Sequence, residues 1–244
     1  VRYSIASLGS QAEFFKWLST GKRVDGLIVV TMALTESDVD VLFNLDVPVV
    51  TVETENDKFA SVGIDNVAAA KMATRHLINL GHEQIGVISG LRDDPMGFSV
   101  PRQREVGYQR ALQEHNIEIR PELKVSGNFS LAGGAEAMVK LRTVHQPPTA
   151  VFAFSDEMSI GAMKTIRDMN LRIPEDISVI GFDDQDVAEY VGLTTIKQPV
   201  AEYGERAAAL LLKLLDGKEE KQIPHIELET NLVIRSTTGP PARL

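Results

Sequence analysis

Short apolar runs alternate along the chain with longer segments in which apolar residues recur every three or four positions. The short runs are rich in β-branched residues and are apolar on both faces, as in strands that are covered by helices on each side. They predict strands at 3–6, 27–30, 47–52, 61–64, 85–89, 151–154 and 178–182.

The longer segments have the periodicity of amphipathic helices. In 67–80, Met72, Ala73, Leu77 and Leu80 form one stripe, and Gly81 marks the helix end. The same pattern predicts helices at 11–20, 104–115, 157–169 and 202–215. Strands that alternate with helices in this way favour βαβ units and parallel sheets, so the predicted fold class is α/β.

Composition narrows the class of protein. The 244 residues are 43% apolar and 24% charged, which suits one large domain or two lobes. The absence of cysteine excludes disulfides and thiolate metal sites. No run approaches the roughly 18 apolar residues of a membrane span, and we expect a cytoplasmic protein without membrane contact. The net charge of -9 argues against nucleic-acid binding by these residues, although a basic module elsewhere in the molecule stays compatible with it.

Motifs for catalysis and metal binding are missing from the sequence. No phosphate-binding loop and no G-x-S-x-G nucleophile turn occurs, and His82-Glu83 is followed by Gly86 where a zinc protease has its second histidine. The five histidines have no ligand spacing, and His82 is interpreted as a turn residue after Gly81. We therefore expect no enzyme, no cofactor and no metal.

Polar residues follow the predicted strands repeatedly. Asp183-Asp184 follows 178–182, Ser155-Asp156 follows 151–154, and Asp65-Asn66 follows 61–64. In open parallel sheets, ligands bind in the crevice beyond the carboxyl ends of the strands. These positions therefore predict a ligand site.

Several of these segments also carry a family resemblance, in family order and over nearly the whole chain. They are 76–85 (HLINLGHEQI), 148–153 (PTAVFA), 155–161, 173–184, 193–199 (LTTIKQP) and 232–237 (LVIRST). The chain resembles the LacI/GalR family of bacterial transcription regulators. Periplasmic sugar-binding proteins share some of these segments, but the Leu-Thr-Thr and Arg-Ser-Thr forms are more similar to those of the regulators.

The resemblance implies a two-lobed, type I periplasmic-binding-protein-like fold, in which each lobe is a parallel sheet flanked by helices. The N-terminal lobe would comprise 1–90 and 199–229, and the C-terminal lobe 91–198 and 230–244. A small sugar-like effector would bind between the lobes and control operator binding by a homodimer. The alternative is the solute-binding protein of a sugar transporter.

The resemblance also implies a missing front end. The family's helix-turn-helix DNA-binding domain has no counterpart in these residues, and 1–8 match the second strand of the N-terminal lobe. We therefore expect this lobe to be incomplete at its start, with a gap or an exposed edge beside the strand at 3–6.

Three effector-binding residues follow from matching motifs. Asp183 resembles the carboxylate that accepts hydrogen bonds from ligand hydroxyls, Arg104 the arginine that donates to ligand oxygens, and Phe129 the aromatic residue that packs on the ligand ring. Each has a structural alternative: Asp183 as a cap, Arg104 as the partner of a surface acid, and Phe129 as core. We favour ligand contact for all three.

Three further positions complete the predicted site. Asp65 and Gln198 match polar positions that line the same cleft, while Asp65 is equally suited to cap a helix and Gln198, before Pro199, to a structural role. Ser155 stands where relatives often have an asparagine that bonds ligand hydroxyls. Its shorter side chain means that the identity of the ligand does not carry over from any relative.

Overall fold

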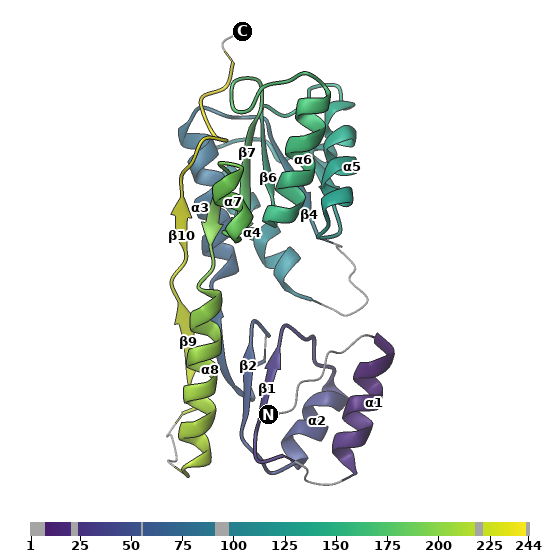
Figure 1. The fold of residues 1–244 in the computed structure, drawn as a ribbon, viewed down its shortest axis with the longest axis vertical. Helices are drawn as coiled ribbons and strands as arrows, with labels where there is room; N and C mark the ends of the chain where they lie inside the picture. Colours follow the sequence, from purple (N-terminus) through teal and green to yellow (C-terminus); the bar gives the residue numbers. More distant parts are fainter. Residues whose placement is uncertain (1–7, 21–23, 55, 91–97, 218–221, 243–244) are drawn as a thin grey trace. The chain divides into compact units, whose positions relative to one another are not determined.

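The computed structural model describes residues 8–20, 24–54, 56–90, 98–217 and 222–242, which form two compact units. Unit 1 contains the described residues of Val1–Ile64, Asp93–Ser99 and Pro199–Leu228. Unit 2 contains those of Asp65–Arg92, Val100–Gln198 and Glu229–Leu244. Each unit has its own sheet (Figure 1).

Unit 1 is built on a four-stranded parallel sheet. Its strands, in spatial order, are β1 (Leu27–Val30), β2 (Val49–Val52), β3 (Ala60–Ile64) and β9 (His225–Leu228). Its helices are α1 (Leu8–Ser19), α2 (Glu36–Asn44) and α8 (Val200–Leu215).

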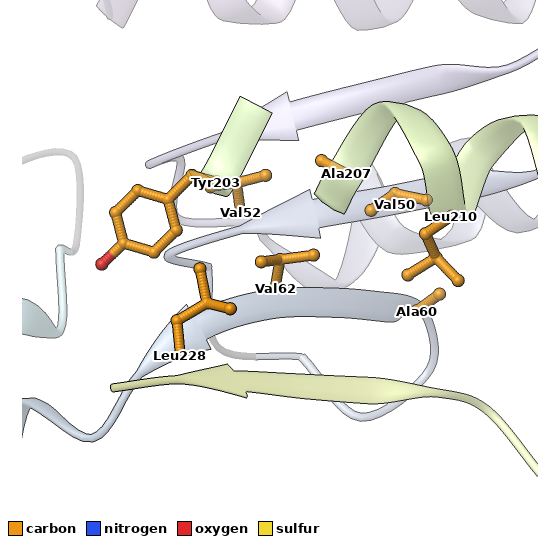
Figure 2. Close-up of a cluster of buried hydrophobic side chains, with 8 residues drawn as sticks. All are labelled: Val50, Val52, Ala60, Val62, Tyr203, Ala207, Leu210 and Leu228. Carbon is orange, nitrogen blue, oxygen red and sulfur yellow. The ribbon is translucent and has the colours of Figure 1, made fainter. Parts of the chain in front are cut away.

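Helix α8 closes one core of unit 1. Figure 2 shows its Tyr203, Ala207 and Leu210 facing apolar residues of the sheet. The strand residues of this cluster are Val50, Val52, Ala60, Val62 and Leu228. A second buried cluster joins α1 and α2 to the sheet through Phe15, Leu18, Val29, Val39, Leu42, Val49 and Phe59. Burial of these side chains is the main favourable contribution to folding of the unit.

Unit 2 is built on a six-stranded sheet. Its strands, in spatial order, are β10 (Asn231–Val233), β8 (Thr194–Lys197), β7 (Ser178–Asp183), β6 (Ala150–Ala153), β4 (Ile85–Ser89) and β5 (Lys124–Ser126). All neighbours pair in parallel except β10, which is antiparallel to β8. The chain leaves β4 toward β5 and returns to β6 on the other side of β4. The strand order thus reverses between β4 and β6, as at the ligand-binding switch point of doubly wound sheets.

Two helix pairs cover the sheet of unit 2 (Figure 1). Helix α3 (Asn66–Asn79) packs on α4 (Val100–Glu114), and α5 (Leu131–Arg142) packs on α6 (Asp156–Asp168). The short η1 (Pro121–Leu123) and α7 (Asp186–Tyr190) complete the unit. This arrangement confirms the predicted α/β class, with parallel sheets flanked by helices.

Most of the long predicted elements are present within a few residues of their expected bounds. The predictions at 27–30 and 85–89 coincide with β1 and β4, and the helix at 67–80 with α3 shifted by one residue. Helices α2, α5 and α7 were not predicted. Thr35 caps α2 by accepting from the Asp38 amide, while the Asp38 side chain accepts from the Thr35 amide, which is a capping box. The expected strand at 3–6, with the gap beside it, lies outside the described residues.

The predicted lobe boundaries need two corrections. The segment 65–90 was placed in the N-terminal lobe, but Asp65–Arg92 belongs to unit 2. The physical reason is that β4 pairs with β5 and β6, and α3 packs closely on α4. Unit 1 also takes Asp93–Ser99, of which 98–99 are described, from the predicted C-terminal lobe at 91–198. The boundary between 198 and 199 coincides, and the last boundary differs by one residue, since unit 1 ends at Leu228 and unit 2 resumes at Glu229.

His82 follows the end of α3 at Gly81, as predicted, and its side chain is buried. Gly81 ends α3 with a φ of 101°, and the ring of His82 then hydrogen-bonds to Thr149 (2.9 Å), Ser178 (3.2 Å) and the carbonyl of Gly239 (2.9 Å). Burial lowers the pKa of His82, because the charged imidazolium loses hydration, and nearby His76 acts in the same direction against the Gly239 carbonyl. The neutral ring therefore ties the C-terminal segment to the sheet.

None of the helices in the described part of the chain is both long and apolar enough to cross a membrane.

The close packing of α3 on α4 generates a first prediction. A Cβ on Gly107 would lie 2.3 Å from the Val67 carbonyl oxygen and 2.8 Å from Ala70 Cβ. We expect Gly107→Ala to lower the free energy of unfolding by about 1–3 kcal/mol, as overpacking does, measured by urea unfolding. The control is Gly204→Ala on α8, where a Cβ meets nothing within 4 Å and helix propensity favours alanine. Equal stability of the two variants would contradict this account of the contact.

The buried His82 generates a second prediction. Its folded-state pKa lies below that of the unfolded chain, so acidification through pH 6.5 protonates the unfolded state first and lowers stability. We expect His82→Gln to reduce this acid-side loss, by at most about 1.4 kcal/mol per pH unit, in urea unfolding between pH 5 and 7.5. His145→Gln, at an exposed histidine, is the control. An unchanged pH slope in His82→Gln would refute the assignment.

Candidate functional site

The carboxyl ends of the strands of unit 2 carry most of the predicted site residues. Asp183 is the last residue of β7, Ser155 lies just beyond β6, and Gln198 follows β8 directly. Phe129 lies in the loop after β5, and Arg104 in the second turn of α4, after β4. Parallel pairing brings these ends to the same edge of the sheet.

Asp183 has the central position among these residues. Its Oδ1 accepts a 2.6 Å hydrogen bond from Gln198 Nε2 and lies 4.0 Å from Arg104 Nη1. The side chain is 21% exposed, so it is partly open to solvent at this edge. The structure therefore brings Asp183, Arg104 and Gln198 together.

The backbone at Asp183 is unusual. Its backbone φ is 127° and that of Asp184 is 58°, and residues other than glycine rarely adopt positive φ angles. Such conformations persist only where surrounding contacts impose them, and they are concentrated at functional sites. The turn directs the Asp183 carboxylate toward Arg104 and Gln198.

Arg104 is buried and held on several sides. Its Nε donates to Asn66 Oδ1 (2.9 Å), its Nη1 donates to the carbonyl of Phe154 (2.5 Å), and its guanidinium lies 3.5 Å from the centre of the Phe182 ring. Contact with an aromatic face stabilises a guanidinium. These three contacts of Arg104 come from α3, β7 and the residue after β6, and none of them is with an acid of α4. Arg104 is a fixed cation at the sheet edge.

The electrostatics of Asp183 combine opposing effects. Burial raises the pKa of this carboxyl, while the charge of Arg104 and hydrogen bonds from Gln198 and the Asp156 backbone amide act to lower it. The carboxyl therefore has lost much of its hydration and is compensated by one cation and two donors.

Phe129 lies against the backbone of the loop after β4. A Cβ on Gly90 would lie 2.1 Å from the Phe129 ring, so the absence of a side chain at 90 makes room for it. The ring remains 37% exposed, and the φ of Phe129 is 47°. Phe129 is therefore not a core residue, which removes the structural alternative considered for it.

Ser155 and Asp65 both cap helices. The hydroxyl oxygen of buried Ser155 accepts from the Met158 amide (3.2 Å) at the start of α6. Asp65 Oδ1 accepts from the Ala68 amide (2.8 Å) at the start of α3, and the residue is exposed. The structural role considered for Asp65 is thus present, and ligand contact by either residue stays a prediction.

Two polar residues of this edge follow predicted strands but are not among the six predicted ligand-binding residues. Buried Asn66 holds Arg104, and fully buried Asp156 accepts from Thr195 Oγ1 (2.6 Å) and from the Gln185 amide (2.8 Å). Both directly follow a residue that was predicted, Asp65 and Ser155. The available signal was therefore position after a strand, but only the first residue of each pair was followed.

Asp156 has the most perturbed carboxyl of the site. Burial raises its pKa to about 7, with smaller increases from Asp183 and Asp184, against hydrogen bonds from Thr195 and the Gln185 amide. Neutral hydrogen-bond donors offset the cost of burying a charged carboxylate less than a cation would. It therefore titrates near neutral pH.

Among the described residues, no group of three or more histidine and carboxylate side chains is placed to hold a metal ion.

Comparison with known proteins gives the family. Residues 74–238 match the model of the periplasmic binding protein-like domain. The chain is 36% identical over 237 residues to the HTH-type transcriptional repressor PurR of Vibrio vulnificus, covering 93% of this chain and 68% of the relative. The chain spans about two thirds of the length of the curated relatives that it matches.

Solved structures agree with this match. The transcriptional regulator CelR in complex with cellobiose is 30% identical with a TM-score of 0.84, over 95% of this chain and 71% of that one. A LacI-family regulatory protein from Chloroflexus aggregans is 29% identical with a TM-score of 0.85, over 97% and 85%. The chain therefore belongs to the LacI family of transcription regulators and contains its periplasmic-binding-protein-like domain.

Proposed function

We propose that this chain is the effector-sensing domain of a LacI-type transcription regulator and binds a small, hydroxyl-rich ligand at the carboxyl edge of the sheet in unit 2. The observation that carries the proposal is the cluster of Asp183, Arg104 and Gln198 from β7, α4 and the residue after β8. A fixed cation and a partly open carboxylate from distant parts of the chain converge there. The exposed Phe129 ring lies after β5, at the same edge of the sheet.

The distance within the cluster suits a bound hydroxyl group. Arg104 Nη1 and Asp183 Oδ1 are 4.0 Å apart, which is too far for a direct hydrogen bond. A ligand hydroxyl between them would accept from the guanidinium and donate to the carboxylate. Both bonds would be charge-assisted, and such bonds are shorter and stronger than neutral ones. The face of Phe129 offers an apolar surface for the ring of a sugar-like ligand.

The names of relatives support a sensor of small molecules. PurR of Vibrio vulnificus is a transcriptional repressor, and CelR was solved with cellobiose. The ligand of this chain is a separate question, since Ser155 differs from the asparagine that relatives often have and its hydroxyl already caps α6. We propose a sugar-like effector without naming the compound.

Control of DNA binding would involve a part of the protein outside these residues. With a net charge of -9, this domain itself is unsuited to a phosphate backbone. A ligand that binds one conformation of the domain more tightly shifts the population toward it, and a DNA-binding domain at the N-terminus would read out that shift. We further propose that the regulator acts as a homodimer in the cytoplasm, catalyses no reaction and binds operator DNA.

The rival proposal is a solute-binding protein of a sugar transporter. The relatives named above are regulators, which favours the sensor. The coding sequence upstream of Val1 separates the two. A helix-turn-helix there supports the regulator, whereas a secretion signal supports the transporter protein.

The first test of the proposed site is a thermal-shift screen with Asp183→Ala. The panel contains D-ribose, D-galacturonate, cellobiose, adenosine and ribose 5-phosphate. A compound that binds only the native state raises the unfolding temperature, so the active member of the panel identifies itself. We expect Asp183→Ala to weaken binding of the active compound by about ten- to a hundredfold, through loss of a charged hydrogen bond worth about 1.5–3 kcal/mol.

Asp168→Ala is the matched control for this variant. Asp168 is an exposed carboxylate at the far end of α6, where it pairs with Lys164. The control variant should bind the active compound like the wild type. Equal affinity of Asp183→Ala and Asp168→Ala would remove Asp183 from the site, and a panel in which no compound binds the wild type would count against a sugar-like effector.

Assembly gives the next prediction. We expect sedimentation velocity at tens of micromolar, roughly the concentration at which a stable dimer is fully formed, to show a two-fold dimer. A family that reads paired DNA half-sites requires two copies of its DNA-binding domain. A single monomeric species at that concentration would contradict the proposed homodimer.

A further inference from the structure

We propose that Asp156, a buried residue beneath the edge of the sheet, positions Asp183 for ligand binding by holding the turn that follows β7. This inference rests on the proposed function, because Asp183 is the ligand contact that Asp156 would orient. Asp156 is completely buried and so cannot touch a ligand itself in this structure. It would act through the backbone that carries Asp183.

The two carboxylate oxygens of Asp156 bind different elements. Oδ1 accepts from Thr195 Oγ1 on β8 at 2.6 Å, and Oδ2 accepts from the Gln185 amide, directly after the turn, at 2.8 Å. The backbone amide of Asp156 also acts to lower the pKa of the Asp183 carboxyl, so the start of α6 faces that side chain. One residue at the start of α6 thus joins β8 to the backbone two residues after Asp183.

The turn requires such contacts. Asp183 and Asp184 both have positive φ, 127° and 58°, which is unfavourable for residues with a Cβ. Asp184 is held on its other side by Arg235 Nη2 at 2.7 Å, and Lys197 Nζ lies 3.8 Å from it. Asp156 is therefore the contact that fixes the turn from the side of α6.

Gly181 makes room for this carboxylate. A Cβ at position 181 would lie 2.3 Å from Asp156 Oδ1 and 2.9 Å from Ser159 Oγ. The carboxylate therefore occupies space above β7 that any other residue at 181 would fill. The pairing of Gly181 with Asp156 joins two segments of the sequence, 155–161 and 173–184, in one packed unit.

Asparagine should be able to replace Asp156 in this role. The groups that bond its carboxylate are the neutral Thr195 hydroxyl and Gln185 amide, and the charged groups that shift its pKa are the acids Asp183 and Asp184. An amide oxygen would accept from the Gln185 amide, and the amide nitrogen would donate to Thr195 Oγ1. Alanine would lose both contacts and leave Gln185 without its acceptor.

The experiment compares Asp156→Ala, Asp156→Asn and Asp183→Ala by isothermal titration. The titrant is whichever of D-ribose, D-galacturonate, cellobiose, adenosine and ribose 5-phosphate raises the wild-type unfolding temperature most. Thr165→Val is the matched control, because Thr165 is a buried hydroxyl on the same helix that bonds the Ala135 carbonyl, away from the turn. All titrations are made well below the unfolding temperature of each variant.

We expect Asp156→Ala to bind the ligand at least roughly tenfold more weakly, which is typical when a residue that orients a ligand-binding side chain is removed. Asp156→Asn should bind it within about threefold of the wild-type affinity. Thr165→Val should lose stability and keep its affinity. Wild-type affinity in Asp156→Ala would overturn the proposal, and so would equal losses in the alanine and asparagine variants.

Crystal structures of the unliganded variants test the proposal independently of any ligand. In Asp156→Ala, residues 183 and 184 should leave their positive φ angles, and in Asp156→Asn they should keep them. An unchanged turn in the alanine variant overturns the proposal. If the turn changes as expected but no compound binds the wild type, the positioning role stands and the sugar-like effector is the part that fails.

Discussion

The pairing register between β7 and β8 determines where the predicted ligand-binding residues Asp183 and Gln198 lie. Asp183 pairs with Lys197, so Gln198 lies one residue beyond the pair and reaches the Asp183 carboxylate at 2.6 Å. Because the strands are parallel, their carboxyl ends also meet the loop after β6 and the start of α6. A shift of one residue would turn Asp183 to the opposite face and separate it from Gln198.

Much of this could be predicted from the sequence because strand ends are local features. The runs at 27–30 and 85–89 are rich in apolar residues and bounded by glycine or polar residues, which indicates their ends. In unit 2, the parallel arrangement of the strands then brings Asp183 and Ser155 to one edge of the sheet. The prediction was weaker where an interaction is nonlocal. The partners of Arg104 come from α3, β7 and the residue after β6, and no spacing in α4 indicates them.

The incorrect lobe assignment has the same origin. Helix α3 follows β3 directly, and local pattern gives no reason to separate it from the strands before it. Its membership of unit 2 depends on contact with α4, where Gly107 lets the two backbones approach. Likewise, a polar residue after a strand is equally suited to cap a helix or to bind a ligand, and Asp65 and Ser155 are caps here.

Three carboxylates lie around the turn after β7, and the negative charge of each is stabilised by different neighbours. Asp184 is paired with Arg235 and is 11% exposed, and Asp183 faces Arg104 at 4.0 Å and is 21% exposed. Asp156 accepts from uncharged donors, so burial raises its pKa to about 7. Asp184 forms a close ion pair with Arg235, and Asp156 is completely buried. Of these three, Asp183 has the most exposed side chain, and its Oδ1 lies 4.0 Å from Arg104 Nη1, so we propose that it is the member suited to bind a ligand hydroxyl.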